Sequence, residues 1–230
     1  MMTLSPAAHH PVKPMHTLFN VVFVEAALCW TSDSFGQALD SETTPVIGGP
    51  CEGCEFVFQG IPTQLASDSR IAPPDEPGEP LVLEGVARRL DSSPASGVIV
   101  YAYHTNAGGV YPKDATFHGR LRGWAQTDSD GRYRFTTIRP AGYPDGAECA
   151  HIHMHVIEPR IGTYYIDNIV FDDDPDLSRE LRKRSENGRA GSGVTYPTKR
   201  DGVWHIRRDI VLGKNIPGYN DRSRAQLSEG

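Results

Sequence analysis

Short runs of apolar and alternating residues follow one another along most of the chain, and Gly, Pro, Asp or Asn bounds each run. Such runs predict β-strands. The residues Asp130 and Gly131 stand between two runs and predict a hairpin turn. The runs expected to be strands are 81–90, 97–105, 120–128, 131–138, 150–158, 164–171 and 203–212. The pattern therefore predicts an all-β fold, an antiparallel β-sandwich core with long loops.

One segment carries helix signals instead. Residues 174–184, "DPDLSRELRKR", begin with Asp174 as the expected N-cap and place Pro175 at the first helical position. Basic side chains at the end of the segment favour the negative end of a helix dipole. We therefore expect one short helix beside the sandwich.

The two ends of the chain differ in composition from its middle. Residues 17–30 are mostly apolar and small residues follow up to Ala38, which is typical of a secretory signal peptide. We expect four parts, which are a leader (1–38), a linker with a CxxC motif and a Pro-rich connector (39–80), the sandwich (81–215) and a polar tail (216–230). The leader predicts export to the periplasm or the outside of the cell, and a cytoplasmic location if the leader is not functional.

Charge and hydropathy exclude two classes of partner. The formal net charge is −6 and no run of Lys and Arg dominates, so nucleic acid is not an expected partner. The apolar stretch 17–30 is too short for a membrane span, which needs about 20 residues.

The chain contains four cysteines, of which Cys51 and Cys54 form a CxxC motif. In an oxidising compartment the pair could close a small disulfide loop. It could also be half of a zinc site, although no second CxxC completes one. For Cys149 we expect the role of a small buried residue.

Residues 151–155 place histidine at every second position. On a strand, alternate residues share one face, so His151, His153 and His155 should point the same way. Two imidazoles on one face of a strand can chelate a metal ion. We predict a metal site at His151 and His153, with His155 as a third ligand or, preferably, a neighbour that does not bind the metal.

Two loop tyrosines could complete this site. Tyr143 lies between Pro and Gly residues in the loop that enters the histidine strand, and Tyr111 follows Gly108 and Gly109. A phenol has an ordinary pKa of about 10. A nearby trivalent cation would nevertheless deprotonate it and take the phenolate as a hard oxygen ligand.

The segments "NAGGVY", "TDSDGRYRFTTIRPAGYP" and "AHIHMHV", in this order, resemble the intradiol ring-cleavage dioxygenases of the protocatechuate 3,4-dioxygenase and catechol 1,2-dioxygenase type. The resemblance covers roughly residues 80–172. It implies a β-sandwich core and one non-haem Fe(III) held by two tyrosines and two histidines. The implied metal ligands are Tyr111, Tyr143, His151 and His153.

The resemblance also implies the reaction. Both atoms of O2 would enter the ring of a catechol-type aromatic to give a muconate-type dicarboxylic acid, and no nicotinamide would be needed. Tyr143 would act as a base for the substrate, and Asn168 would take the place of the family's active-site glutamine. The expected partners are a small aromatic diol and O2, and a homo-oligomer is left open.

The chain departs from the family pattern at several points. Glu148 stands where the family usually has an arginine beside the substrate, and a carboxylate there would oppose negative charge. Arg139 and Arg120 are candidates to replace that arginine. The loop between Tyr143 and His151 is short, and the helical dimerisation domain of the catechol-type enzymes has no counterpart.

Two other interpretations stay open. A zinc hydrolase could use His151, His153 and His155 with a bound water. A non-catalytic, exported sandwich module could keep the fold for binding, and Glu148 is the feature that favours it.

Overall fold

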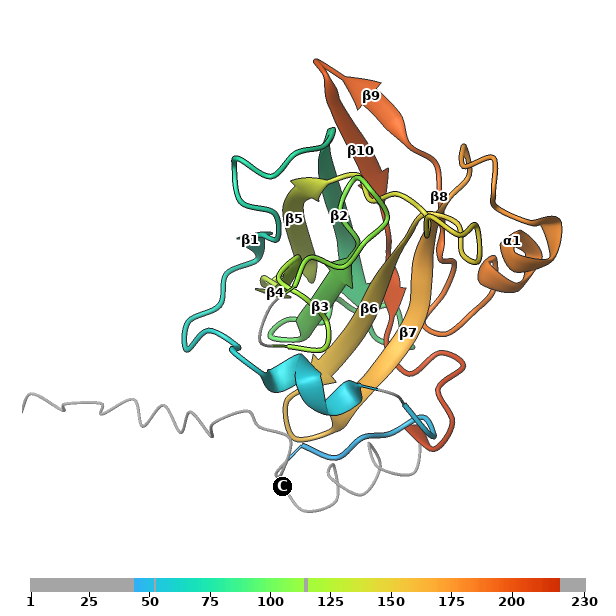
Figure 1. Cartoon of the computed structure of the whole chain (residues 1–230). Coiled ribbons are helices and arrows are strands. Elements are labelled where there is room, and N and C mark those ends of the chain that lie inside the picture. The colour runs from blue at the N-terminus through green and yellow to red at the C-terminus, as the bar shows by residue number, and fades with distance from the viewer. Residues whose placement is uncertain (1–43, 52, 114–115, 220–230) are drawn as a thin grey trace, which may run out of the picture. The chain divides into compact units, whose positions relative to one another are not determined.

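Two β-sheets pack face to face across one apolar core (Figure 1). The computed structural model describes residues 44–51, 53–113 and 116–219. The first sheet has the order β1 (Asp68–Arg70), β5 (Arg132–Ile138), β2 (Pro80–Arg88), β10 (Val203–Arg207) and β9 (Thr198–Arg200), with β11 (Ile210–Val211) paired to β2. The second sheet has the order β4 (Arg122–Gln126), β3 (Ile99–His104), β6 (His151–Glu158), β7 (Gly162–Phe171) and β8 (Val194–Thr195).

The predicted β-sandwich is confirmed, but its sheets are mixed rather than purely antiparallel. The neighbours β3–β4, β3–β6, β6–β7 and β2–β5 are antiparallel as expected. The pairs β1–β5, β10–β2, β11–β2 and β7–β8 are parallel. Parallel neighbours cannot be joined by a tight turn. They arise here because long connections bring distant segments together, with β1 and β8 at sheet edges and β10 and β11 beside β2.

Alternation along β6 separates the core from the histidines. Ile152, Met154 and Val156 belong to the core between the sheets, where they meet β2 and β5 residues such as Leu83 and Phe135. His151, His153 and His155 therefore lie on the opposite, outer face of the second sheet. The predicted common face of the three histidines is confirmed.

The turn at Asp130 and Gly131 forms, but the expected hairpin does not. Gly131 has φ +75°, and the Asp128 carboxylate accepts hydrogen bonds from the backbone N–H groups of Asp130 and Arg132 at 2.9 and 2.8 Å. The strands on either side, β4 and β5, belong to different sheets. The hairpin prediction was wrong because the turn motif specifies only the local reversal, and the chain uses it to cross from one sheet to the other.

The single predicted helix is present and shorter than expected. Helix α1 spans Arg179–Ser185, and its N-cap is Ser178, whose hydroxyl accepts a hydrogen bond from the N–H of Leu181 at 3.1 Å. The prediction that Asp174 caps the helix was wrong. The Asp174 carboxylate instead accepts a hydrogen bond from the N–H of Ala150 at 2.7 Å, directly before β6.

Residues 44–80, which we expected to be a linker, contribute structure of their own. They include β1 and the 3-10 helix η1 (Cys54–Phe58), and Ile47 and Ile71 enter the main core. Val57 and Phe58 of η1 pack in a second apolar cluster with residues of β3, β4 and β6. The segment therefore covers part of the outer face of the second sheet. The expected leader, 1–38, lies outside the described residues.

The part of the chain described above contains no helix with the length and apolar character of a membrane span.

Candidate metal centre

Two histidines at the start of β6 bring their ring nitrogens together. The Nε2 atoms of His151 and His153 are 3.1 Å apart, with the two rings nearly perpendicular. Two phenol oxygens join them. Tyr111 Oη lies 2.8 Å from His153 Nε2, and Tyr143 Oη lies 3.3 Å from Tyr111 Oη. These four residues are called the tyrosine–histidine cluster below.

The opposite nitrogen of each ring has a hydrogen-bond acceptor. His151 Nδ1 lies 2.7 Å from the carbonyl oxygen of Cys149, and His153 Nδ1 lies 3.1 Å from Oδ1 of Asn168. With an acceptor at Nδ1, a neutral ring keeps its proton there and leaves a lone pair on Nε2. In that tautomer the two Nε2 lone pairs face each other, and a shared proton or a metal ion between them removes their repulsion. This is the arrangement of histidines that bind a metal and donate their other N–H to a carbonyl.

A β-bulge aims Asn168 at His153. Ile152 pairs with Ile169, whereas Met154 pairs with Ile166, so β7 holds one extra residue opposite His153. An extra residue of this kind redirects side chains locally. Asn168, which the family resemblance implied in place of the active-site glutamine, therefore lies where its Oδ1 can orient the His153 ring.

The two tyrosine loops are packed backbone to backbone. Gly109 has φ +75°, and a Cβ atom at this position would collide with the carbonyl of Gly142. Only glycine satisfies both conditions without strain. The Thr105 hydroxyl also donates to the carbonyl of Ala141 at 2.8 Å, which ties the end of β3 to the Tyr143 loop. The separation of Tyr111 and Tyr143 is thus fixed by main-chain contacts.

Burial keeps His153 and Tyr111 of the cluster uncharged when no cation is bound. Burial, with the neighbouring rings of His151 and His155, lowers the pKa of His153 to about 3. Burial and the Tyr143 hydroxyl raise the pKa of Tyr111 well above its ordinary value. Neutral imidazole is the form that binds metals, and a phenol with a raised pKa becomes a phenolate only beside a strong positive charge. The donor set therefore suits a highly charged cation.

A cavity of about 440 Å³ opens beside the cluster. This volume is within the range of small-molecule sites. Tyr111, Tyr143 and His153 form one side, and Pro50, Phe117 and Tyr165 contribute to the rest of its lining. An aromatic ring could therefore lie against the phenol and imidazole atoms, between walls that mix aromatic and polar groups.

Neither candidate arginine is at this cavity. Arg139 forms two hydrogen bonds with Asp173, at 2.9 and 2.6 Å, and lies over the rings of Phe171 and Trp204. Arg120 is paired with Glu76 at 2.5 Å. Glu148 is exposed, and its backbone carbonyl accepts a hydrogen bond from the N–H of Tyr143 at 2.9 Å. Among the described residues that line the cavity there is no Arg or Lys.

His155 is on the same face of β6 but has different neighbours. Its Nδ1 lies 3.6 Å from Sγ of Cys54, which forms a disulfide with Cys51. Its ring also packs near those of Tyr101 and His118. The residues Cys51, Cys54, His118 and His155 are called the cysteine–histidine cluster below. Cys149 is a free buried thiol, as expected, and burial raises its pKa to about 11.

Tyr103 was not predicted from the sequence and joins the two clusters. Its ring stacks on His153 with centroids 4.5 Å apart and on His118 with centroids 3.9 Å apart. Tyr103 is opposite His153 in the antiparallel β3–β6 pair, which accounts for the first contact. The available sequence signal was Tyr101, Tyr103 and the neighbouring His104 in "YAYH", an aromatic pattern on what reads as an ordinary strand.

Comparison with known proteins points to one family. Residues 52–191 match the family model described as "Dioxygenase". The chain is 40% identical over 185 residues to catechol 1,2-dioxygenase 1 of Acinetobacter lwoffii, covering 67% of this chain and 59% of that protein. It is 31% identical over 115 residues to the protocatechuate 3,4-dioxygenase beta chain of Burkholderia cepacia, covering 44% and 48%. The chain thus spans about half to three fifths of the length of these relatives.

Solved structures show the same fold. The 3-chlorocatechol 1,2-dioxygenase of Rhodococcus opacus 1CP superposes with a TM-score of 0.53 at 20% identity, covering 68% of each chain. The catechol 1,2-dioxygenase of Pseudomonas arvilla C-1 gives a TM-score of 0.53 at 21% identity, covering 73% of this chain and 61% of that one.

Proposed function

We propose, because the chain belongs to the family of intradiol ring-cleavage dioxygenases, that it binds one Fe(III) in the tyrosine–histidine cluster and cleaves a small aromatic diol with O2. Both oxygen atoms would enter the product, a muconate-type dicarboxylic acid. The observation that carries the proposal is the pair of facing Nε2 atoms, 3.1 Å apart, with two phenol oxygens beside them.

The donor set fits ferric iron. Metal–ligand bonds of about 2.0–2.1 Å place neighbouring ligands about 3 Å apart, close to the 2.8–3.3 Å found here. Two phenolates would neutralise most of the charge of a trivalent ion, while zinc sites are usually built from His, Cys and carboxylates. Tyr111, Tyr143, His151 and His153 would hold the ion, which would supply Lewis-acid activation and a template for the diol.

The residues of the chain have distinct tasks in this reaction. Asn168 and the Cys149 carbonyl keep the His153 and His151 rings oriented through their Nδ1 protons. Tyr143 Oη is the atom placed to take up a proton from the entering diol, as a general base. Tyr111 is held by the tight backbone contact of its loop and stays a fixed ligand.

The cavity favours an uncharged diol. Its described lining contains aromatic, apolar and imidazole groups and no cationic side chain to pair with a substrate carboxylate. Arg139 and Arg120, the two candidates for that role, are both paired with carboxylates elsewhere. We therefore propose catechol-like rings without an acidic substituent as the substrate class.

A three-histidine zinc hydrolase has less support. The Nδ1 of His155 faces a cysteine sulfur rather than the His151–His153 pair. A non-catalytic binding module does not explain four buried or half-buried metal donors beside a cavity.

We also propose that the chain is exported. The disulfide between Cys51 and Cys54 supports this location, because disulfides persist mainly in oxidising compartments. Cell fractionation that finds full-length protein in the cytosol would contradict it.

The first test is the metal content and visible spectrum of the purified protein. Tyrosinate bound to Fe(III) gives a charge-transfer colour that zinc cannot produce. We expect near-stoichiometric iron and an absorption band that changes in both Tyr111→Phe and Tyr143→Phe. Tyr196→Phe is the matched control, because Tyr196 is exposed near α1.

Oxygen uptake then tests the reaction. Catechol should consume one O2 per ring cleaved, and labelled O2 should place both atoms in the dicarboxylic acid. A colourless protein that rejects Fe(III), or an iron protein that consumes no O2 with any catechol, would contradict the proposal.

A further inference from the structure

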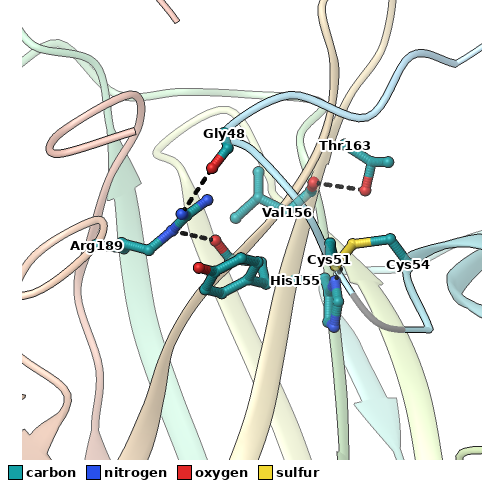
Figure 2. Close-up of a disulfide and its surroundings, with 8 residues drawn as sticks. Gly48, Cys51, Cys54, His155, Val156, Thr163 and Arg189 are labelled. Carbon is teal, nitrogen blue, oxygen red and sulfur yellow. Dashed lines mark hydrogen bonds between the residues drawn. A yellow bond between two sulfur atoms is a disulfide. The ribbon is translucent and has the colours of Figure 1, made fainter. Parts of the chain in front are cut away.

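The cysteine–histidine cluster has the composition of a second metal site. The ligand atoms of Cys51, Cys54 and His155 all lie within 4.8 Å of one another. Figure 2 shows the His155 ring directly beside the two sulfur atoms. Two cysteine sulfurs and an imidazole are soft and borderline donors of the kind that tetrahedral Zn²⁺ takes. This cluster contains no tyrosine and shares no residue with the tyrosine–histidine cluster.

His118 supplies a second imidazole, and with it a fourth candidate ligand. Its Nδ1 lies 2.9 Å from the hydroxyl oxygen of Tyr101, whereas its buried Nε2 has no hydrogen-bond partner in the described structure. The Nε2 atom faces the CxxC loop, because a Cβ atom added to Gly53 would lie 2.8 Å from it. His118 is only 1% exposed. A buried nitrogen that lacks a partner costs free energy, and a metal ion beside it would recover that cost.

The cysteine segment is anchored independently of its disulfide. The N–H of Ile47 donates to the carbonyl of Thr163 at 2.9 Å. Nη1 of Arg189 donates to the carbonyl of Gly48 at 3.0 Å, as Figure 2 shows. On the other side of the motif, the indole of Trp124 donates to the carbonyl of Val57 at 2.7 Å. Reduction of the disulfide would therefore leave both thiols next to His155.

We propose that reduction of the Cys51–Cys54 disulfide creates a Zn²⁺ site made of Cys51, Cys54, His155 and His118. A dithiol reductant would supply two electrons and two protons, and would itself become a disulfide. Zn²⁺ would then displace the two thiol protons. Tetrahedral bonds of about 2.3 Å separate two thiolate sulfurs by about 3.8 Å, so the sulfurs need only a small movement within the anchored loop.

The site would also touch the catalytic cavity. Cys51 and His155 both contribute to the cavity lining, and Tyr103 stacks between His118 and His153. Formation of the site would thus change one wall of the cavity while the four ligands of the tyrosine–histidine cluster stay in place.

The test uses the full chain in two redox states, with Co²⁺ as a spectroscopic substitute for Zn²⁺. Thiolates bound to tetrahedral Co²⁺ give a near-ultraviolet charge-transfer band and intense visible bands that neither tyrosine nor histidine ligation produces. We expect these bands, with one Co²⁺ per chain, after reduction with a phosphine and none before it. Added Zn²⁺ should remove the bands and protect both thiols from alkylation, as read by mass spectrometry.

Variants identify the ligands. Cys51→Ser and Cys54→Ser should each weaken Co²⁺ binding more than about 100-fold, because loss of a direct ligand exceeds the 10–100-fold cost of losing its neighbours. His118→Asn should shift the visible bands. Cys149→Ser, at the free buried thiol, is the matched control and should bind as the wild type does.

The redox comparison of the wild-type protein needs no substitution, so a misfolded variant cannot decide the result. Absence of thiolate bands in the reduced wild type, or unchanged binding in Cys54→Ser, would overturn the proposal. These bands arise from sulfur ligands, so their absence would not bear on the proposed ferric centre. In the same way, absence of the ferric colour would not bear on the proposed Zn²⁺ site.

Discussion

The start and the middle of β6 carry histidines on the same face, and their surroundings differ. At the beginning of the strand, His151 and His153 meet two phenols beside an open cavity. Four residues after His151, His155 meets a disulfide beneath the cover formed by η1. The sheet is the same at both positions, so the difference comes from the segments that lie over it. A strand fixes which way a side chain points, and the segments that cross the strand decide its chemistry.

Loss of a proposed iron ligand should have the largest effect, and it should affect the tyrosine–histidine cluster alone. His153→Ala should abolish stoichiometric iron binding and lower ring-cleavage activity by more than about 100-fold, since even neighbours of metal ligands cost 10–100-fold. Metal analysis and oxygen uptake measure both quantities. His205→Ala, on β10 of the other sheet, is the matched control. Full iron content in His153→Ala would show that His153 is not an iron ligand.

Removal of the Asn168 side chain should have the next largest effect. Asn168→Ala leaves the His153 Nδ1 proton without its acceptor at 3.1 Å, so iron affinity should fall about 10–100-fold. Asn168→Asp keeps an oxygen at this position and should restore most of the affinity. Competition with an iron chelator measures the difference. Equal iron affinities in the wild type and Asn168→Ala would show that Asn168, and the bulge that positions it, do not support the His153 ligand.

The 3-10 helix η1, which carries Cys54 and covers His155, is anchored by Trp124. Trp124→Phe removes the donor to the Val57 carbonyl and should lower the free energy of unfolding by about 1–3 kcal/mol. It should also speed alkylation of the reduced cysteines, because η1 is held less tightly. Denaturant unfolding and mass spectrometry measure these changes.

Trp204→Phe is the matched control for this indole. The Trp204 Nε1 donates to the exposed Glu79 carboxylate at 2.9 Å, so this variant should lose less stability than Trp124→Phe. Equal losses in the two variants would show that η1 is not anchored through Trp124.

The most gradual effect is a pH dependence at His155, which is spread over several pH units. Burial lowers the pKa of His155 from 6.5 to about 3. The unfolded chain therefore takes up a proton near pH 6.5, and the folded chain does so only near pH 3. The free energy of unfolding of the metal-free protein should thus be highest above pH 6.5 and fall with decreasing pH, by about 1.4 kcal/mol per pH unit from this residue.

His155→Gln should remove this contribution. Denaturant unfolding at several pH values between about 6 and about 4 should give a shallower slope for the variant. Identical slopes would mean that His155 already carries a proton in the folded chain.

The sequence predicted the parts of the site that lie in contiguous motifs. His151 and His153 alternate on one strand, and Tyr111 and Tyr143 follow glycines and prolines that mark rigid loops, so both could be found before the fold was known. Asn168 was predicted from the family resemblance. The bulge that aims its side chain at His153 could not be predicted from the sequence. Bulges and sheet membership depend on pairing between distant segments, which no local pattern records.

The cysteine–histidine cluster shows more clearly what a local sequence pattern cannot predict. Cys54 and His155 are 101 residues apart, and the loop carrying His118 lies between them in the sequence. Nothing in "CEGCE" or in the third histidine of the strand indicates that they meet. The connector 39–80 looked like a linker because it is rich in Pro and polar residues, although Ile47 and Ile71 are buried in the main core.

The close packing of Gly109 against Gly142 has a consequence for redesign. Because the two tyrosine loops meet through their backbones, side-chain substitutions elsewhere in the cavity leave the spacing of Tyr111 and Tyr143 unchanged. The far wall is built from a separate segment, at Pro50, and from the exposed ring of Phe117. The metal-binding residues and the opposite wall of the cavity can therefore be changed independently. Libraries of substitutions at Pro50 and Phe117 should alter which aromatic rings enter the cavity without moving the tyrosine–histidine cluster.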